Sequence, residues 1–135
     1  MKKLSILLAD DHSGVTEVVA HRLKSAFELV GIVRNGQALV DAAAKLNPDL
    51  IITDIFMPTL NGIEAVKSVR ELGCKAKVIF LTVYADSDFV QTCFSVGATG
   101  YVVKPRIATD LLPAVKAVLS GKTFVSQSVC DQEGA

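Results

Sequence analysis

Residues 50–54 read Leu-Ile-Ile-Thr-Asp, a short apolar run that closes on a carboxylate. The run lacks the alternation of apolar and polar residues seen in a strand with one wet face, so it predicts a strand covered on both faces. Runs of the same kind occupy Leu4–Ala9, Leu29–Val33, Lys77–Leu81 and Gly100–Val103. These runs predict the strands of a parallel sheet.

Helical spacing fills the segments between the runs. Apolar residues recur at intervals of three and four around residues 15–26, 39–46, 63–69, 89–94 and 111–119. Asn61, with Glu64 three residues later, predicts the start of the third helix. Pro113 predicts that the last helix starts near Thr109, because proline is tolerated only in or next to a first turn.

The alternation of the two patterns predicts an α/β fold. Right-handed crossovers between parallel strands give a doubly wound (βα)5 unit, an open five-stranded parallel sheet of the flavodoxin type with helices on both faces. A chain of 135 residues is too short for a closed eight-stranded barrel. In an open sheet of this kind, ligands bind outside the carboxyl ends of the strands, near the topological switch point.

Reactive side chains follow the predicted strands at that edge. Asp10 and Asp11 follow the first strand, Asp54 the third, Thr82 the fourth and Lys104 the fifth. Carboxylates brought this close repel one another, and a Mg²⁺ ion, which prefers oxygen ligands, relieves that repulsion. Asp54 is then placed as a nucleophile toward phosphorus. Lys104 and Thr82 supply an ammonium and a hydroxyl to the oxygens of a transferring phosphoryl group.

Composition excludes other classes of partner. Lys plus Arg equals Asp plus Glu, at 14 each, and aromatic residues make up 6%, which argues against a nucleic-acid surface on this domain. No run approaches the ~20 apolar residues that span a bilayer. The start of the chain is interpreted as a strand rather than a signal peptide. Cys74, Cys93 and Cys130 are scattered, which is typical of reduced thiols in a cytoplasmic protein.

With these residues assembled, the chain resembles the CheY-like receiver domain of two-component response regulators. The resemblance runs from Lys3 to about Val125. It is carried by five motif segments, at residues 7–12, 51–58, 61–62, 78–82 and 97–105.

The resemblance implies a role for each site residue. Asp54 accepts a phosphoryl group from a sensor histidine kinase, so the chain is a signalling phosphoacceptor and not an enzyme. Asp10, Asp11 and Asp54 hold Mg²⁺ together with the main-chain carbonyl of Phe56. Thr82 and Lys104 contact the phosphoryl group.

The resemblance also implies a switch. Tyr101 turns inward when Thr82 moves toward the phosphate, which remodels the face made by the fourth helix, the fifth strand and the fifth helix. That face is the expected surface for a homodimer. A cis peptide bond before Pro105 is expected as well, because the trans preference of X-Pro bonds is small.

Two residues depart from the family pattern. Val83 stands after Thr82, where the family usually has a very small residue, and Phe56 places an apolar ring two residues after Asp54. Both narrow access to a phosphoaspartate. We therefore expect slow dephosphorylation and poor use of small phosphodonors.

The end of the chain bears on the output. Residues 118–126 resemble the junction between receiver and linker in regulators with a LuxR-type DNA-binding domain. We therefore divide the chain into a receiver domain at 1–121 and a linker or tail at 122–135. Transcriptional control would act through an output domain outside these residues, and a single-domain regulator is the alternative.

Two rival functions stay open. An aspartyl phosphatase or phosphotransferase would show multiple turnover on a small phosphoester, although such hydrolases commonly carry their nucleophile as Asp-x-Asp after the first strand. A phosphorylation-independent protein-binding module would bind no phosphoryl analogue, although every residue type that phosphorylation needs is present.

Overall fold

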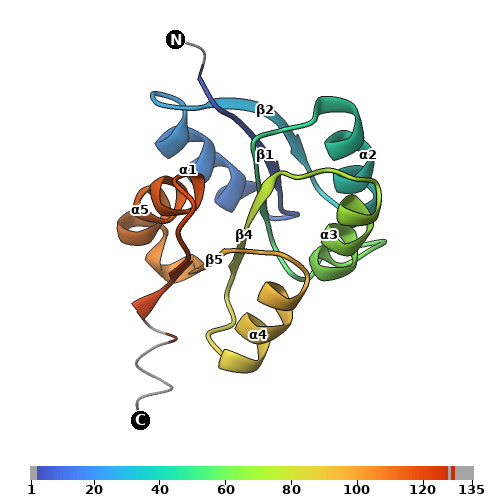
Figure 1. Cartoon of the computed structure of the whole chain (residues 1–135). Coiled ribbons are helices and arrows are strands. Elements are labelled where there is room, and N and C mark those ends of the chain that lie inside the picture. The colour runs from blue at the N-terminus through green and yellow to red at the C-terminus, as the bar shows by residue number, and fades with distance from the viewer. Residues whose placement is uncertain (1–2, 128, 130–135) are drawn as a thin grey trace.

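The computed structural model describes residues 3–127 and residue 129, which fold around one parallel sheet (Figure 1). The strand order is β2-β1-β3-β4-β5-β6. The strands are β1 (Ser5–Ala9), β2 (Glu28–Val33), β3 (Leu50–Thr53), β4 (Lys77–Thr82), β5 (Gly100–Val103) and β6 (Phe124–Val125). The first five confirm the five predicted strands, each to within one residue at its ends.

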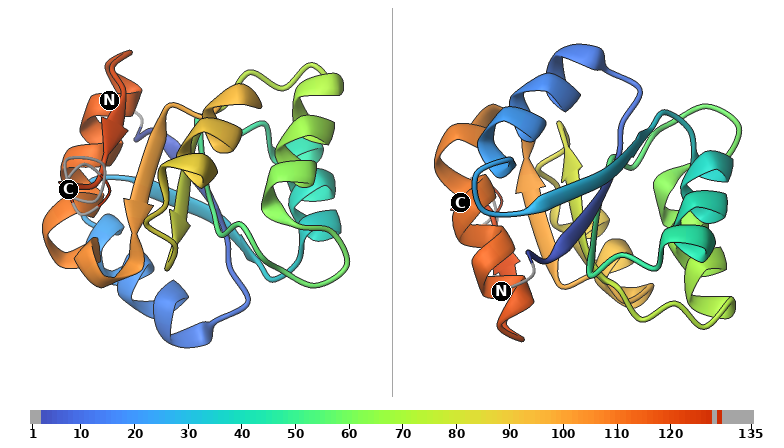
Figure 2. Two further views of the ribbon diagram at one scale, coloured as in Figure 1. Left: turned by 90° about the horizontal axis from the view of Figure 1, so that it is seen from below. Right: turned by 90° about the horizontal axis from the view of Figure 1, so that it is seen from above.

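Helices cover both faces of the sheet, as the predicted doubly wound fold requires. They are α1 (Ser13–Leu23), α2 (Gly36–Leu46), α3 (Gly62–Glu71), α4 (Ser87–Ser95) and α5 (Ile107–Leu119), with a short 3-10 helix η1 (Lys104–Arg106) before α5. Figure 2 shows α1 and α5 on one side of the sheet and α2, α3 and α4 on the other.

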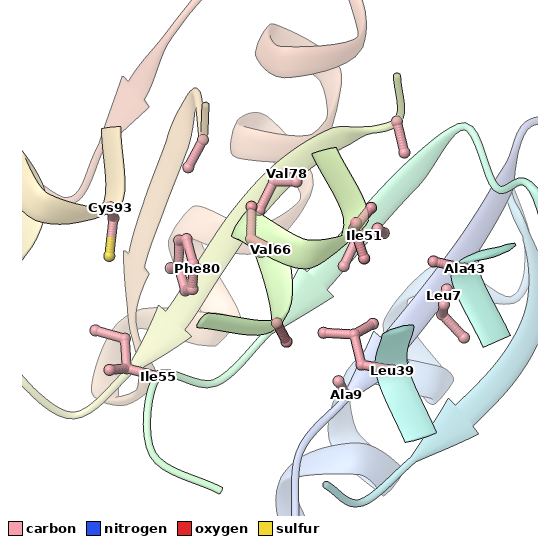
Figure 3. Close-up of a cluster of buried hydrophobic side chains, with 14 of the residues drawn as sticks. Leu7, Ala9, Leu39, Ala43, Ile51, Ile55, Val66, Val78, Phe80 and Cys93 are labelled. Carbon is pink, nitrogen blue, oxygen red and sulfur yellow. The ribbon is translucent and has the colours of Figure 1, made fainter. Parts of the chain in front are cut away.

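Each face of the sheet carries its own apolar core. The core under α2, α3 and α4 includes Leu39, Val66, Phe80 and Cys93 (Figure 3). The opposite core packs side chains of α1 and α5, among them Leu23, against β1, β3, β4 and β5. Strand β2 is the exception to the predicted double covering, since it lies at the edge of the sheet and none of its residues is fully buried.

The sixth strand was not predicted. Phe124 and Val125 pair in parallel with Gly100 and Tyr101 of β5. They lie in the stretch 122–135 that the sequence assigns to a linker or tail. A strand of two residues is too short to carry a periodic pattern, so its apolar side chains do not announce it.

The predicted start of the last helix was wrong. Helix α5 begins at Ile107, directly after η1, so Pro113 lies inside the helix rather than in its first turn. Proline has no N–H to donate, so the carbonyl of Thr109 loses its partner four residues on. The long apolar face of α5, which buries Leu111, Ala114, Val115 and Val118, outweighs that loss.

The prediction of a cis peptide bond before Pro105 was wrong as well. No peptide bond among residues 3–127 is cis, and Pro105 occupies the first turn of η1. A trans proline fits that position because the missing N–H would have no helical partner there.

The start of α3 matches the prediction. The Asn61 side chain accepts a hydrogen bond of 2.9 Å from the Glu64 N–H, which makes Asn61 the N-cap. The Glu64 carboxylate pairs with Lys67 at 3.8 Å, on the outside of the helix. This cap fixes where the loop after β3, which carries part of the candidate site, ends.

Candidate functional site

The topological switch point lies between β1 and β3. From β1 the chain crosses to β2 on one side and, later, to β3 on the other. Ala9 pairs with Thr53, so the residues that follow, Asp10 and Asp54, emerge side by side. The Asp54 N–H donates to the Ala9 carbonyl at 2.9 Å and extends the pairing to the edge of the sheet.

Lys104 joins these two carboxylates. Its Nζ donates a hydrogen bond of 2.9 Å to Asp54 Oδ2. It also lies 2.9 Å from Asp10 Oδ2, an ion pair without hydrogen-bond geometry. Lys104 directly follows β5, two strands from β3, and only a long side chain spans that distance. The Lys104 side chain is 9% exposed and that of Asp54 is 7% exposed, so the pair is largely shielded from solvent.

Ile55 and Gly62 fix the position of Asp54. Its Oδ1 accepts a hydrogen bond of 2.7 Å from the Ile55 N–H, and the residue is 5% exposed. Gly62 packs directly against its backbone, since a Cβ at that position would lie 1.9 Å from the Asp54 carbonyl oxygen. The glycine of the Asn61-Gly62 motif is therefore required by close approach.

Burial governs the electrostatics of the pair. Desolvation raises the pKa of Asp54 above its ordinary value, with Asp10 adding to the rise and Lys104 opposing it. Desolvation lowers the pKa of Lys104, but the hydrogen bond to Asp54 and the negative charges of Asp54 and Asp10 outweigh it and leave that pKa raised. The Lys104 ammonium therefore keeps its proton. Burial disfavours the charged form of the Asp54 carboxylate, and a further cation beside it would stabilise that form.

His12 joins the site and was not singled out from the sequence. Its Nδ1 lies 3.0 Å from Asp10 Oδ1 and 3.2 Å from Asp11 Oδ1. The same atom is 3.3 Å from Lys104 Nζ. The signal available in the sequence was its position directly after Asp10-Asp11, on the same loop.

The acidic cluster fits a divalent cation. Asp10, Asp11, His12 and Asp54 each offer one ligand atom, and these atoms lie within 4.8 Å of one another. Asp10 Oδ2 is buried, and its close neighbour is the Lys104 ammonium at 2.9 Å, an ion pair without hydrogen-bond geometry. A set dominated by carboxylate oxygens is the donor chemistry that Mg²⁺ prefers. The main-chain carbonyl of Phe56 stays a predicted ligand.

Thr82 ends β4 and Tyr101 lies in β5, the two strands that follow β3 in the order of the sheet. The Thr82 side chain is fully buried, and its Oγ1 accepts from the Tyr84 N–H at 3.5 Å. The Tyr101 hydroxyl donates to the Tyr84 carbonyl at 2.5 Å. Tyr101 is fully buried, and desolvation raises its pKa, so the hydroxyl remains a donor. Both predicted switch residues thus hold the same loop, at Tyr84.

An aromatic cluster that includes Phe56, two residues after Asp54, was also missed. The rings of Phe56, Tyr84 and Phe89 contact one another, with centroids 5.1 to 5.9 Å apart. They come from the loop after β3, the loop after β4 and α4, so sequence spacing does not bring them together. Phe56 is 49% exposed and Val83 is 60% exposed, which puts both predicted access residues at the surface.

Comparison with known families assigns the class. The model of the response regulator receiver domain matches residues 6–116 of this chain. The chain belongs to the response regulator receiver domain family. A receiver domain is a signalling module of two-component systems rather than a catalytic enzyme, and the acidic cluster fits the Mg²⁺ site of such a domain.

The curated relatives include transcriptional regulatory proteins and response regulators. The chain is 34% identical over 131 residues to the transcriptional regulatory protein DegU of Brevibacillus brevis, covering 94% of this chain and 55% of DegU. It is 31% identical over 129 residues to the nitrate/nitrite response regulator protein NarL of Escherichia coli, covering 93% of this chain and 59% of NarL. The chain thus spans little more than half the length of these relatives.

Solved structures agree with the fold. A two-component response regulator of the LuxR family from Aurantimonas sp. SI85-9A1 superposes with a TM-score of 0.89 at 25% identity, covering 99% of this chain and 100% of that one. The isolated receiver domain of RcsB from Salmonella enterica serovar Typhimurium, determined with the phosphomimetic BeF₃⁻, gives 0.87 at 27% identity, covering 96% of this chain and 98% of that one.

Among the helices of the described part of the chain, none has the length and apolar character needed to cross a membrane.

Proposed function

We propose that Asp54 is the phosphoacceptor of this receiver domain and that a sensor histidine kinase is the donor. The observation that carries the proposal is the position of Lys104, whose ammonium lies 2.9 Å from both Asp54 Oδ2 and Asp10 Oδ2. The ammonium neutralises charge where a phosphoryl oxygen would develop it. Phosphoryl transfer depends mainly on such positioning and neutralisation.

The chemistry of the step is an in-line displacement. An oxygen of Asp54 attacks the phosphorus of a phosphohistidine, the P–N bond breaks, and its electron pair stays on the imidazole. Asp10, Asp11, Asp54 and the Phe56 carbonyl would hold Mg²⁺, which neutralises charge on the phosphoryl oxygens when bound. Lys104 serves one phosphoryl oxygen, and the Thr82 hydroxyl is drawn toward another.

The signal leaves through Tyr101. A phosphoryl group adds ~1.5–2 negative charges, which pull Thr82 and Lys104 toward Asp54. Since Thr82 and Tyr101 both bond the backbone of Tyr84, movement of Thr82 changes the site that holds the tyrosine hydroxyl. We propose that this exchange switches the α4-β5-α5 face.

The output is proposed from the relatives. DegU and NarL are regulatory proteins of which this chain matches a part, so we propose a DNA-binding output domain in the whole protein and no nucleic-acid contact by this domain. A homodimer through the α4-β5-α5 face is part of the same proposal. So is a cytoplasmic location, which the free thiols Cys74 and Cys93 support.

The first experiment is titration with Mg²⁺ and beryllofluoride, an acyl-phosphate mimic. Wild-type protein should bind the mimic only with Mg²⁺, and Asp54→Asn should abolish binding. Asp41→Asn is the matched control, because Asp41 lies on the exposed side of α2, where its Oδ1 accepts a hydrogen bond of 3.1 Å from Gln37. Failure of the wild type to bind would favour the phosphorylation-independent module. Sedimentation of the same samples tests dimerisation.

A further inference from the structure

The segment after α5 reaches the strand that carries the switch residue. In addition to the β6 pairing, the Phe124 N–H donates to the Thr99 carbonyl at 3.0 Å and the Ser126 N–H donates to the Tyr101 carbonyl at 2.9 Å. The backbone of Tyr101 is therefore bonded by residues outside the expected receiver boundary.

Ser126 also bonds β5 and α5 through its side chain. It is fully buried, its Oγ accepts from the Val103 N–H at 3.1 Å, and its hydroxyl donates to Asp110 Oδ2 at 2.8 Å. The hydroxyl proton and one lone pair are thus both used. Val103 immediately precedes Lys104, so the serine fixes the backbone from which the catalytic ammonium projects.

Asp110 is held in turn from α5 and from η1. Arg106 Nε donates to Asp110 Oδ2 at 2.9 Å, and Thr109 Oγ1 donates to Oδ1 at 3.2 Å. These partners leave Asp110 Oδ2 directed at Ser126. The arrangement is a chain of hydrogen bonds from Arg106 through Asp110 and Ser126 to Val103.

Apolar side chains seat the same segment on both cores. Phe124 packs against the α1 and α5 core, whereas Val125 packs against the core that contains Tyr101. Val129 is buried in that second core, at 1% exposure. The segment therefore lies across the edge of β5 and contacts the core around the switch tyrosine.

We propose that Ser126, locked by Asp110, is a positioning residue for Lys104 and Tyr101. The proposal rests on the proposed function, because it assigns Ser126 to the same phosphoacceptor site. The serine holds β5 so that the Lys104 ammonium meets Asp54 and the Tyr101 ring keeps its buried place. By reciprocity of coupling, a group bound at Asp54 tightens the segment that leads away from the receiver.

The test compares Ser126→Ala with Ser126→Thr in the full 135-residue chain. Beryllofluoride affinity with Mg²⁺ should fall on the order of fivefold in Ser126→Ala, the lower end of coupling between two sites. Ser126→Thr keeps the hydroxyl and should restore affinity. Ser5→Ala is the matched control, because Ser5 also donates to an aspartate, Asp49, but at the amino end of β1, the end of the strand away from Asp10. It should leave affinity unchanged.

A second readout follows Tyr101 directly. The chain has two tyrosines, so fluorotyrosine labelling gives two resonances, and Tyr84→Phe assigns them. Ser126→Ala should shift or broaden the Tyr101 resonance, and Ser5→Ala should not. Asp110→Asn provides a further variant if Ser126→Ala fails to fold.

The outcomes separate the two proposals. Wild-type protein that binds beryllofluoride while Ser126→Ala keeps both wild-type affinity and an unchanged Tyr101 resonance overturns the positioning role alone. Wild-type protein that binds no beryllofluoride overturns the phosphoacceptor proposal, and the Tyr101 resonance then still decides whether Ser126 positions β5.

Discussion

Lys104 Nζ lies 2.9 Å from Asp54 Oδ2 and bridges residues that are fifty positions apart in the sequence. The bridge exists because β3 and β5 end at the same edge of one parallel sheet, with β4 between them. It places a cation that keeps its proton against a carboxylate whose pKa burial raises. The same ammonium lies 2.9 Å from Asp10 Oδ2, so it joins a proposed metal ligand to the proposed phosphoacceptor.

Loss of this ammonium should disable the site. In Lys104→Met, Asp54 and Asp10 face each other without their shared cation, and the developing phosphoryl charge loses a donor. We expect phosphorylation to slow by about 10²–10³-fold, the usual effect of removing one such donor. Single-turnover transfer from a phosphorylated histidine kinase measures it. Lys67→Met, on the exposed face of α3, is the control, and equal rates for both variants would rule out the assigned role of Lys104.

Access to the phosphoaspartate should depend on Val83 and Phe56. Val83 stands where the family resemblance implies a very small residue, and the ring centroids of Phe56 and Tyr84 lie 5.3 Å apart. Val83→Ala should shorten the lifetime of the phosphoryl group by a factor of about 3–10, a barrier change of roughly 0.7–1.4 kcal/mol. Decay of the phosphorylated protein at constant Mg²⁺ gives the rate. Leu72→Ala, an exposed apolar residue at the end of α3, should decay like the wild type. An unchanged lifetime in Val83→Ala would remove the access argument.

The sheet edge was predictable because its chemistry follows directly from strand ends. Asp10, Asp54, Thr82 and Lys104 each sit at the carboxyl end of a buried run, and parallel strands bring those ends together. That reasoning needs only the runs and the topology. It places the carboxylates and the ammonium, whose meeting the structure bears out in the Lys104 contacts.

Other features depend on contacts that no local pattern encodes. The rings of Phe56, Tyr84 and Phe89 meet because separate loops converge, and the spacing of the three residues does not announce it. Ser126 resembled a linker serine because its partners, Asp110 and the Val103 N–H, are supplied only by tertiary packing. The position of Pro113 inside α5 has the same cause, since burial of one helix face outweighed a local preference.

The loop after β3 contains a strained residue. Thr59 has a φ of 72°, a left-handed conformation that a β-branched side chain rarely adopts. Thr59→Gly should raise the free energy of unfolding by about 0.5–1 kcal/mol, the relief of roughly 1–2 kcal/mol of strain less the entropy cost of glycine. Urea unfolding measures the change, provided that the slope of free energy against urea concentration is the same for both proteins.

Thr59→Ala is the control for that prediction. It removes the branched side chain but keeps a Cβ in the left-handed conformation, so it should recover less stability than glycine does. Destabilisation by Thr59→Gly would mean that the threonine side chain makes contacts that outweigh the strain.

The Asp110 lock gives the domain an acid-dependent stability. Desolvation raises the pKa of Asp110, but hydrogen bonds from Arg106 and Ser126 lower it by a larger amount. The pKa of Asp110 in the folded protein therefore lies below the ordinary 3.8. A depressed carboxyl pKa contributes stability that is fully present above 3.8 and is lost as pH falls through the folded value. Above pH 5 Asp110→Asn should therefore lower the free energy of unfolding by about 1–2 kcal/mol, the range for a charged hydrogen bond with a half-exposed arginine partner.

The difference between Asp110→Asn and the wild type should shrink as the pH falls below 3.8, because the wild-type carboxylate takes up its proton there. Chemical unfolding across pH 3 to 7 measures the two curves. Asp41→Asn, which changes an exposed acid on α2, should run parallel to the wild type throughout. A difference between Asp110→Asn and the wild type that stays constant with pH would mean that shape, and not charge, makes Asp110 a partner for Ser126.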